Sequence, residues 1–159
     1  MKLVRIRLGD QVLELIEAGA VRERWPVSTA VAGAGERDGS EQSPRGRHEI
    51  SEMIGAGEAE RSVFVGREPT GEICTPELAA AEPGRDWILT RILWLDGLEE
   101  GRNRGGDVDS KRRYIYIHGT PEEDRLGEPA SHGCIRMRNA DVIALFDRVE
   151  VGTAVEIVD

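Results

Sequence analysis

Two of the chain's three histidines and one of its two cysteines fall in one short segment, "YIYIHGTPEEDRLGEPASHGCIRMRN" (114–139). A cysteine becomes a strong nucleophile near neutral pH once a neighbouring base has taken its proton, and imidazole is the usual base. Cys134 is therefore a candidate nucleophile. His118, from a separate stretch of chain, is the candidate base that would reach it through space.

The residues just before Cys134 could stabilise negative charge. Gly133 lets the backbone approach a substrate closely, and consecutive backbone N–H groups can then point at one spot. Such donors form an oxyanion hole when a nucleophile attacks a carbonyl. If the segment 131–137 is extended, His132 and Cys134 project to the same side. Gly133 and its neighbouring backbone N–H groups are therefore candidates for an oxyanion hole around Cys134.

The same side chains also allow a metal site. His118, His132 and Cys134 could be three zinc ligands, with Cys74 or His48 as the fourth. In that case the cysteine would be a ligand and would not react with electrophiles. Residue types alone leave both alternatives open.

Several short strands must position these residues. Alternation of apolar and charged residues predicts a strand at 3–8, and two runs around "EAG" (17–19) predict a hairpin. Further strands are expected in "RHEISEMI" and "SVFVGR", in the apolar run 86–95, in 113–118, which would deliver His118, and in 154–158. Loops are expected at 32–46 and 99–112, and 69–85 is expected to hold at most one helical turn.

One helix is predicted from Asn139, which is a plausible N-cap, with Gly152 after its end. Its core-facing side chains would be Val142, Leu145, Phe146 and Val149. Many short strands, long glycine-rich loops and one helix predict a mostly β fold, a β-sandwich or barrel-like domain. A length of 159 residues fits a single domain, 1–159.

Composition excludes several classes of protein. The net charge of −9 opposes non-specific binding to nucleic acid or to anionic membranes. No apolar stretch approaches the roughly 18 residues of a membrane span, so no membrane anchor is expected. No signal-peptide pattern follows Met1, which indicates a cytoplasmic protein if Met1 is the natural start. A periplasmic location is expected if a signal peptide was removed.

The pair "IHG" (117–119) and "SHGCIRM" (131–137) closely resembles the YkuD-type L,D-transpeptidases of bacterial cell-wall metabolism. The upstream stretches "PVSTA", "SPRGRHEI" and "GRNRGG" resemble the same family, in the same order. The resemblance implies Cys134 as nucleophile, His118 as general base and acid, and Gly119 as the residue whose backbone carbonyl orients that imidazole. It places His132, Gly133 and Cys134 at the oxyanion region and Arg136 near the donor peptide. The alternative for His132 is a structural or substrate-orienting role. Ser131 is a further candidate contact to substrate or a residue that holds its loop.

The resemblance implies attack on the bond between diaminopimelate and the terminal D-alanine of a peptidoglycan tetrapeptide, through a thioester and without a cofactor. The substrate would be a tetrapeptide or a muropeptide, and acylation of Cys134 by carbapenems is expected as well. From the expected location we predict hydrolysis, an L,D-carboxypeptidase that recycles peptidoglycan fragments. The alternative is an L,D-transpeptidase that forms cross-links or exchanges D-amino acids. A zinc-binding or non-catalytic wall-binding domain is a minor alternative.

Overall fold

The computed structural model describes residues 1–159 and is built mainly of β-strands. The elements are β1 (Lys2–Arg7), β2 (Val12–Glu17), β3 (Ala20–Ser28), β4 (Gly46–Ile54), β5 (Ser62–Val65), β6 (Glu68–Ile73), α1 (Pro76–Ala81), β7 (Ile88–Gly97), a 3-10 turn η1 (Gly106–Val108), β8 (Tyr116–Gly119), a second 3-10 turn η2 (Glu123–Arg125), β9 (Ile135–Met137), α2 (Asn139–Phe146) and β10 (Ala154–Val158).

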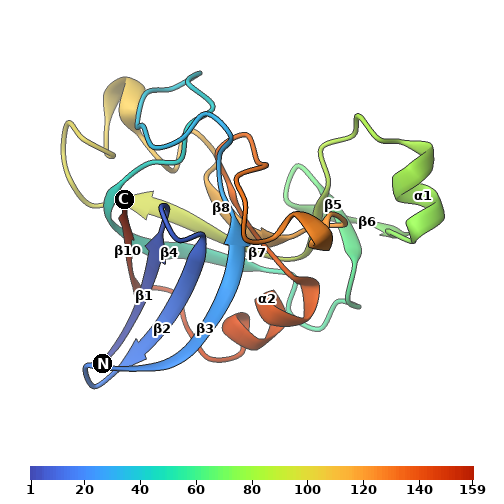
Figure 1. The fold of residues 1–159 in the computed structure, drawn as a ribbon, viewed down its shortest axis with the longest axis horizontal. Coiled ribbons are helices and arrows are strands. Elements are labelled where there is room, and N and C mark those ends of the chain that lie inside the picture. Colours follow the sequence, from blue (N-terminus) through green and yellow to red (C-terminus); the bar gives the residue numbers. More distant parts are fainter.

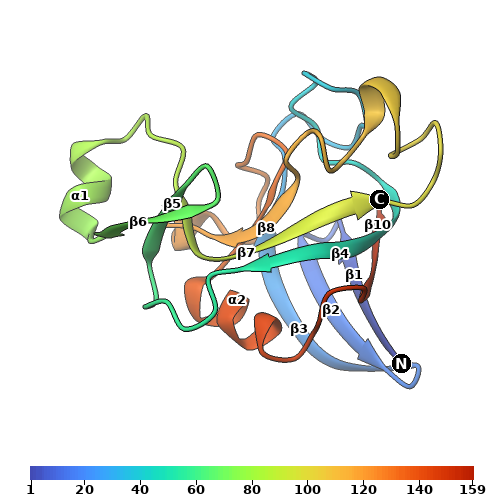
Figure 2. The same cartoon turned by 180° about the vertical axis from the view of Figure 1, so that it is seen from behind.

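The strands form one sheet in the order β4-β10-β1-β2-β3-β9-β8-β7-β5-β6. Because β4 also pairs with β7, the first eight strands of that order close into a barrel, and the β5–β6 hairpin extends from β7 outside it (Figures 1 and 2). Two pairs are parallel, β1 with β10 and β8 with β9. The expected mostly β, barrel-like fold is confirmed.

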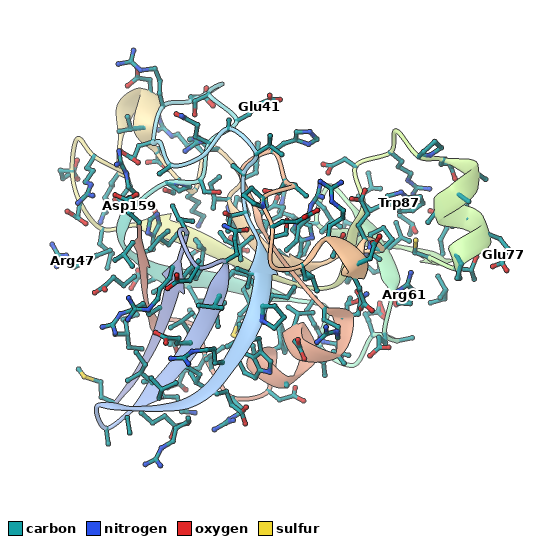
Figure 3. All side chains as sticks on the ribbon, in the orientation of Figure 1. Glu41, Arg47, Arg61, Glu77, Trp87 and Asp159 are labelled. Carbon is teal, nitrogen blue, oxygen red and sulfur yellow. The ribbon has the colours of Figure 1, made fainter.

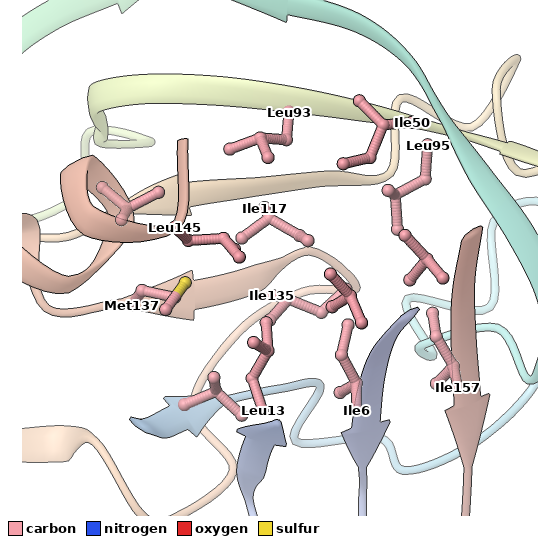
Figure 4. Packing of buried hydrophobic residues seen from close by; sticks show 14 of the residues in the cluster. Ile6, Leu13, Ile50, Leu93, Leu95, Ile117, Ile135, Met137, Leu145 and Ile157 are labelled. Carbon is pink, nitrogen blue, oxygen red and sulfur yellow. The ribbon is translucent and has the colours of Figure 1, made fainter. Parts of the chain in front are cut away.

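The barrel is filled by side chains that alternate along the strands. Ile117 of β8 and Ile135 of β9 are fully buried at its centre (Figure 4). Helix α2 packs against β7 and β8, and its Val142 and Leu145 join the same core. Neither helix is long and apolar enough to cross a membrane. Alternation leaves the other face of β8 and β9 free for different side chains.

A small lobe stands beside the barrel. It contains the β5–β6 hairpin and α1, which lies away from the barrel in both ribbon views (Figures 1 and 2). Its own core joins Val63, Cys74, Trp87 and Leu89, and Trp87 lies on the inner side of α1 (Figure 3). Phe64 of β5 packs instead against the outer face of β7 and β8 with Ile92 and Tyr116.

Three expectations about elements are wrong. The segment 69–85 holds most of strand β6 besides α1, and β6 escaped notice because its exposed residues do not alternate between apolar and polar. The helix ends at Phe146, well short of Gly152. Asn139 is its first residue and not its N-cap: position 138 is the cap, and the Asn139 side chain bonds elsewhere. The strands expected at 3–8 and 154–158 and the hairpin around "EAG" are present as β1, β10 and β2–β3.

Candidate active site

The outer face of β8 and β9 brings the chemically active residues together. These adjacent parallel strands pair His118 with Arg136, and Ile117 with Ile135. Because Ile117 and Ile135 point into the barrel, His118 and Arg136 point out of it, and Cys134 lies on the same outer face two residues before Arg136. The strand register thus places an imidazole, a thiol and a guanidinium on one surface.

That surface is the floor of a cavity of about 330 Å³. The β5–β6 hairpin and the segments around Tyr114 and His132 contribute to its walls. The cavity is lined by Phe64, Gly66, Arg67, Asp86, Ile88, Ile92, Arg113, Tyr114, Tyr116, His118, Ser131, His132, Cys134 and Arg136.

His118 is held in one orientation. It is 3% exposed, and its Nδ1 lies 2.6 Å from the Gly119 carbonyl oxygen. A carbonyl can only accept, so Nδ1 carries the proton and Nε2 of the neutral ring has a free lone pair. Burial lowers the pKa of His118 to about 4, an effect that the Gly119 carbonyl partly opposes. The imidazole is therefore neutral and basic at Nε2 at physiological pH.

The Cys134 thiol is half-buried and protonated. Its Sγ donates to the Tyr114 carbonyl oxygen at 3.2 Å and accepts from the Tyr116 N–H at 3.3 Å. Burial raises the pKa of this thiol to about 11, while the Tyr116 N–H and the guanidinium of Arg136 act in the opposite direction. Burial thus favours the neutral form of both the thiol and His118.

The segment before Cys134 bends and is not extended as the sequence had suggested. Gly133 has φ +134°, so residues 132–134 form a bend, and β9 begins only after them. The hydroxyl of Ser131 accepts from the Gly133 N–H at 3.2 Å and donates to the Cys134 carbonyl at 2.6 Å, which fixes the bend. His132 is exposed and lines the cavity rim.

Two upstream segments hold the bend in place. The Ser43 hydroxyl donates to the Gly133 carbonyl at 2.8 Å and accepts from the Ala30 N–H at 3.1 Å. The Thr29 carbonyl accepts from the N–H of Ser131 at 2.9 Å. Residues of "PVSTA" and "SPRGRHEI" therefore support the nucleophile's loop without lining the cavity.

The charged lining contains residues that the sequence did not single out. The lining contains three guanidinium groups, those of Arg67, Arg113 and Arg136, and one carboxylate, that of Asp86. The cavity therefore carries positive charge, although the net charge of the chain is −9. Arg113 is half-buried and donates to the Gln42 carbonyl at 2.6 Å. Arg113 is the third of three consecutive basic residues, 111–113, and the sequence does not indicate that one of them is half-buried at a cavity.

An aromatic cluster positions Arg67 at the cavity wall. The guanidinium lies 4.9 Å from the ring centroid of Trp94 and 5.2 Å from that of Tyr114, and it donates to the Tyr116 hydroxyl at 3.2 Å. Arg67 and Gly66, both with positive φ, make the tight turn of the β5–β6 hairpin. A turn of this kind can be recognised in the sequence as a strand reversal. The sequence does not indicate which distant residues the turn will contact.

The fourth zinc ligand is not brought to this cavity. His48 is fully buried in β4, where its ring nitrogens contact the Gly46 carbonyl at 3.1 Å and the Ser110 hydroxyl at 2.8 Å. Cys74 is fully buried in the core of the small lobe. No group of three or more His, Cys, Asp or Glu side chains is arranged to hold a metal ion.

Comparisons with known proteins agree with this geometry. The family model of the L,D-transpeptidase catalytic domain, YkuD, matches residues 1–157. The putative L,D-transpeptidase YqjB of Bacillus subtilis is 51% identical over 56 residues, which make up 35% of this chain and 32% of that protein.

Solved L,D-transpeptidases share the fold. The enzyme from Xylanimonas cellulosilytica superposes with a TM-score of 0.57 at 21% identity, covering 98% of this chain and 59% of the other. L,D-transpeptidase 3 from Mycobacterium tuberculosis, in complex with a faropenem-derived adduct, gives 0.60 at 13% identity, covering 99% and 60%. The matches span less than two thirds of each of these proteins. The chain belongs to the YkuD family of L,D-transpeptidase catalytic domains.

Proposed function

We propose that this protein cleaves the bond before the terminal D-alanine of a peptidoglycan tetrapeptide, with Cys134 as nucleophile and water as acyl acceptor. The observation that carries the proposal is the placing of Cys134 and His118 on one face of two adjacent parallel strands, in one cavity. The His118 ring is fixed through Nδ1, which leaves Nε2 for proton transfer.

The first half-reaction forms a thioester. His118 Nε2 takes the thiol proton as Cys134 Sγ bonds to the carbonyl carbon before D-alanine, and backbone N–H groups of the bend 132–134 stabilise the oxyanion. The C–N bond then breaks, and Nε2 returns the proton to the leaving amine of D-alanine.

The second half-reaction regenerates the thiol. Nε2 takes a proton from water as the water oxygen bonds to the thioester carbon. The C–S bond breaks, and the sulfur recovers the proton from the imidazolium. The product is a tripeptide with a new carboxylate.

The charge of the cavity lining supports a peptide donor. The three guanidinium groups of the lining suit a stem peptide rich in carboxylates, and Arg136 is the proposed contact, because only its Nη1 is used, at 3.2 Å from the Ala130 carbonyl. A cavity of about 330 Å³ is at the low end of the roughly 300–1,000 Å³ of ligand sites.

The test is a mass-spectrometric assay with purified disaccharide-tetrapeptide, with and without an acceptor amine. We expect tripeptide and free D-alanine in both arms, lost in Cys134→Ala and in His118→Gln. Matched controls are Cys74→Ala and His48→Gln, which change the same residue types outside the cavity. Full activity of Cys134→Ala would refute the catalytic assignment, and zinc bound at one equivalent would favour the metal site.

L,D-transpeptidation is the second candidate, favoured by the name of the family. It predicts dimer or amine-exchanged product in the arm with acceptor, and little tripeptide there. Cell fractionation bears on the choice, since the carboxypeptidase proposal carries the expectation of a cytoplasmic protein. An exported protein would favour cross-linking.

Acylation by β-lactams is part of the same proposal. A faropenem-derived adduct is present in L,D-transpeptidase 3 from M. tuberculosis. A carbapenem would react here by bonding its ring carbonyl to Cys134 Sγ while the lactam C–N bond breaks and the nitrogen gains the proton. Intact-mass spectrometry should show an addition of the whole drug, absent in Cys134→Ala.

A further inference from the structure

A buried polar cluster lies directly behind Gly119. Asn139, the first residue of α2, is 1% exposed, and its side chain fills the space that a side chain at position 119 would need. A methyl group on Gly119 would sit 2.2 Å from Asn139 Oδ1 and 2.8 Å from the Leu89 carbonyl oxygen. The glycine after His118 is therefore required by the amide of Asn139, at a distance of 20 residues in sequence.

Each polar atom of this amide is engaged. Nδ2 donates to the Thr120 carbonyl oxygen and to Glu123 Oε2, both at 2.8 Å. Oδ1 accepts from the Thr90 hydroxyl at 2.5 Å. The Asn139 backbone N–H also donates to Glu123 Oε2, at 2.8 Å. The side chain can adopt one orientation only, and it joins α2 to β7 and to the chain that leaves β8.

Thr90 shows that this arrangement is held under strain. It is fully buried with φ +77°, a conformation that is unfavourable for a β-branched residue. It lies at the irregularity of β7 between Leu89, which pairs with Gly119, and Ile92, which pairs with His118. Such strain persists only where the surroundings fix it, and it often marks a functional site.

We propose that Asn139 is a positioning residue for His118. Its amide anchors the Thr120 carbonyl, and with it the peptide that follows Gly119, and so keeps the Gly119 carbonyl oxygen 2.6 Å from His118 Nδ1. Thr90 and Glu123 hold the amide in turn. The inference rests on the proposed function, because it concerns the orientation of the proposed base.

The experiment compares Asn139→Ala and Thr90→Val with wild type by kcat and KM on disaccharide-tetrapeptide, and by ¹⁵N NMR of labelled histidine. We expect kcat to fall on the order of 10- to 100-fold with KM within about threefold, as for a misplaced catalytic group. The NMR spectrum should show His118 moving from the Nδ1–H tautomer of wild type toward a mixture with the Nε2–H tautomer.

Two further variants separate positioning from loss of stability. Thr90→Ser keeps the hydroxyl and should retain kcat within about threefold and the wild-type tautomer. Glu14, on β2 and away from the cavity, has a buried carboxylate that forms ion pairs with Arg7 and Arg24. Glu14→Gln removes the charge of this carboxylate and should lower stability without moving the His118 signals. All variants are compared at a temperature where each is fully folded.

The outcomes distinguish the two proposals. If Asn139→Ala and Thr90→Val keep kcat and the wild-type tautomer while His118→Gln is inactive, the positioning role is wrong and the proposed function stands. If they lose kcat only as much as Glu14→Gln does, with the tautomer unmoved, the role is structural and the inference is overturned. If His118→Gln keeps its activity, the proposed function itself fails.

Discussion

The pH dependence of the alkylation rate of Cys134 tests whether the proposed nucleophile and base are neutral before substrate binds. With its pKa raised by burial to about 11, the thiol has about one molecule in 1,000 as thiolate at pH 8. An ordinary thiol with a pKa near 9 would have about one in ten. The thiolate of a weaker acid is intrinsically more nucleophilic, by about tenfold over this interval. The two effects together predict alkylation about tenfold slower than that of an ordinary cysteine.

The assay is alkylation by iodoacetamide from pH 5 to 11, with peptide mass mapping to separate Cys134 from Cys74. The rate at Cys134 should rise about tenfold per pH unit throughout the range up to pH 10, because only the thiolate reacts. His118→Gln should change this profile little. Cys74, which is fully buried, is the slow internal reference.

A thiolate–imidazolium pair would behave differently. Its alkylation rate would reach a plateau below pH 8, and the plateau would vanish in His118→Gln. That result would refute the neutral pair and the step in which the proton moves during attack. With the neutral pair, kcat/KM should fall only below about pH 4, where His118 is protonated and Nε2 no longer accepts a proton.

Three further predictions follow from the same contacts. Gly119→Ala should lower kcat on the order of 100-fold, because a methyl group would sit 2.2 Å from Asn139 Oδ1 and displace the carbonyl that orients the imidazole. An unchanged kcat would contradict this, provided that circular dichroism shows the variant to be folded. Arg136→Gln should raise the KM for tetrapeptide on the order of tenfold, because a charged hydrogen bond to a substrate carboxylate is lost. The rise in KM should be much smaller for a donor whose carboxyl groups are amidated. An equal rise for both donors would argue against carboxylate recognition. Finally, burial lowers the pKa of His48 and His118, so the unfolded chain binds more protons than the folded one and stability falls as pH drops from about 6.5 to 4. For His118 the loss is about 3 kcal/mol, measurable by urea unfolding at pH 7 and pH 4, and His118→Gln should reduce it.

The sequence was informative where residues act through short-range patterns. Alternation in β1 and β10 and the turn between β2 and β3 predicted those strands. The types and spacing around Cys134 and His118 indicated a thiol and an imidazole as candidate reactive groups, and both line one cavity of the structure. The resemblance to a known family supplied the role of the Gly119 carbonyl, which the structure shows in hydrogen-bond contact with His118.

The remaining features depend on contacts between distant segments. Arg67 reaches the cavity because the β5–β6 hairpin pairs with β7, and no local pattern indicates that partner. Arg113 looks like one of three solvated charges until the loop that contains Gln42 folds over it. Asn139 was noticed as a capping residue, but its partners Thr120 and Thr90 are 19 and 49 residues away.

The closure of the barrel has a consequence for how the chain folds. In the closed barrel, β10 lies between β1 and β4 and pairs with both, so residues 154–158 join two segments that are far from them in sequence. Contacts of such long sequence separation form slowly, since the loop entropy is lost before they stabilise anything. During synthesis, the edges of β1 and β4 that β10 later covers stay unpaired until residues 154–158 have emerged. Unpaired edges of this kind attract other strands, so the emerging chain is prone to aggregation until β10 is made.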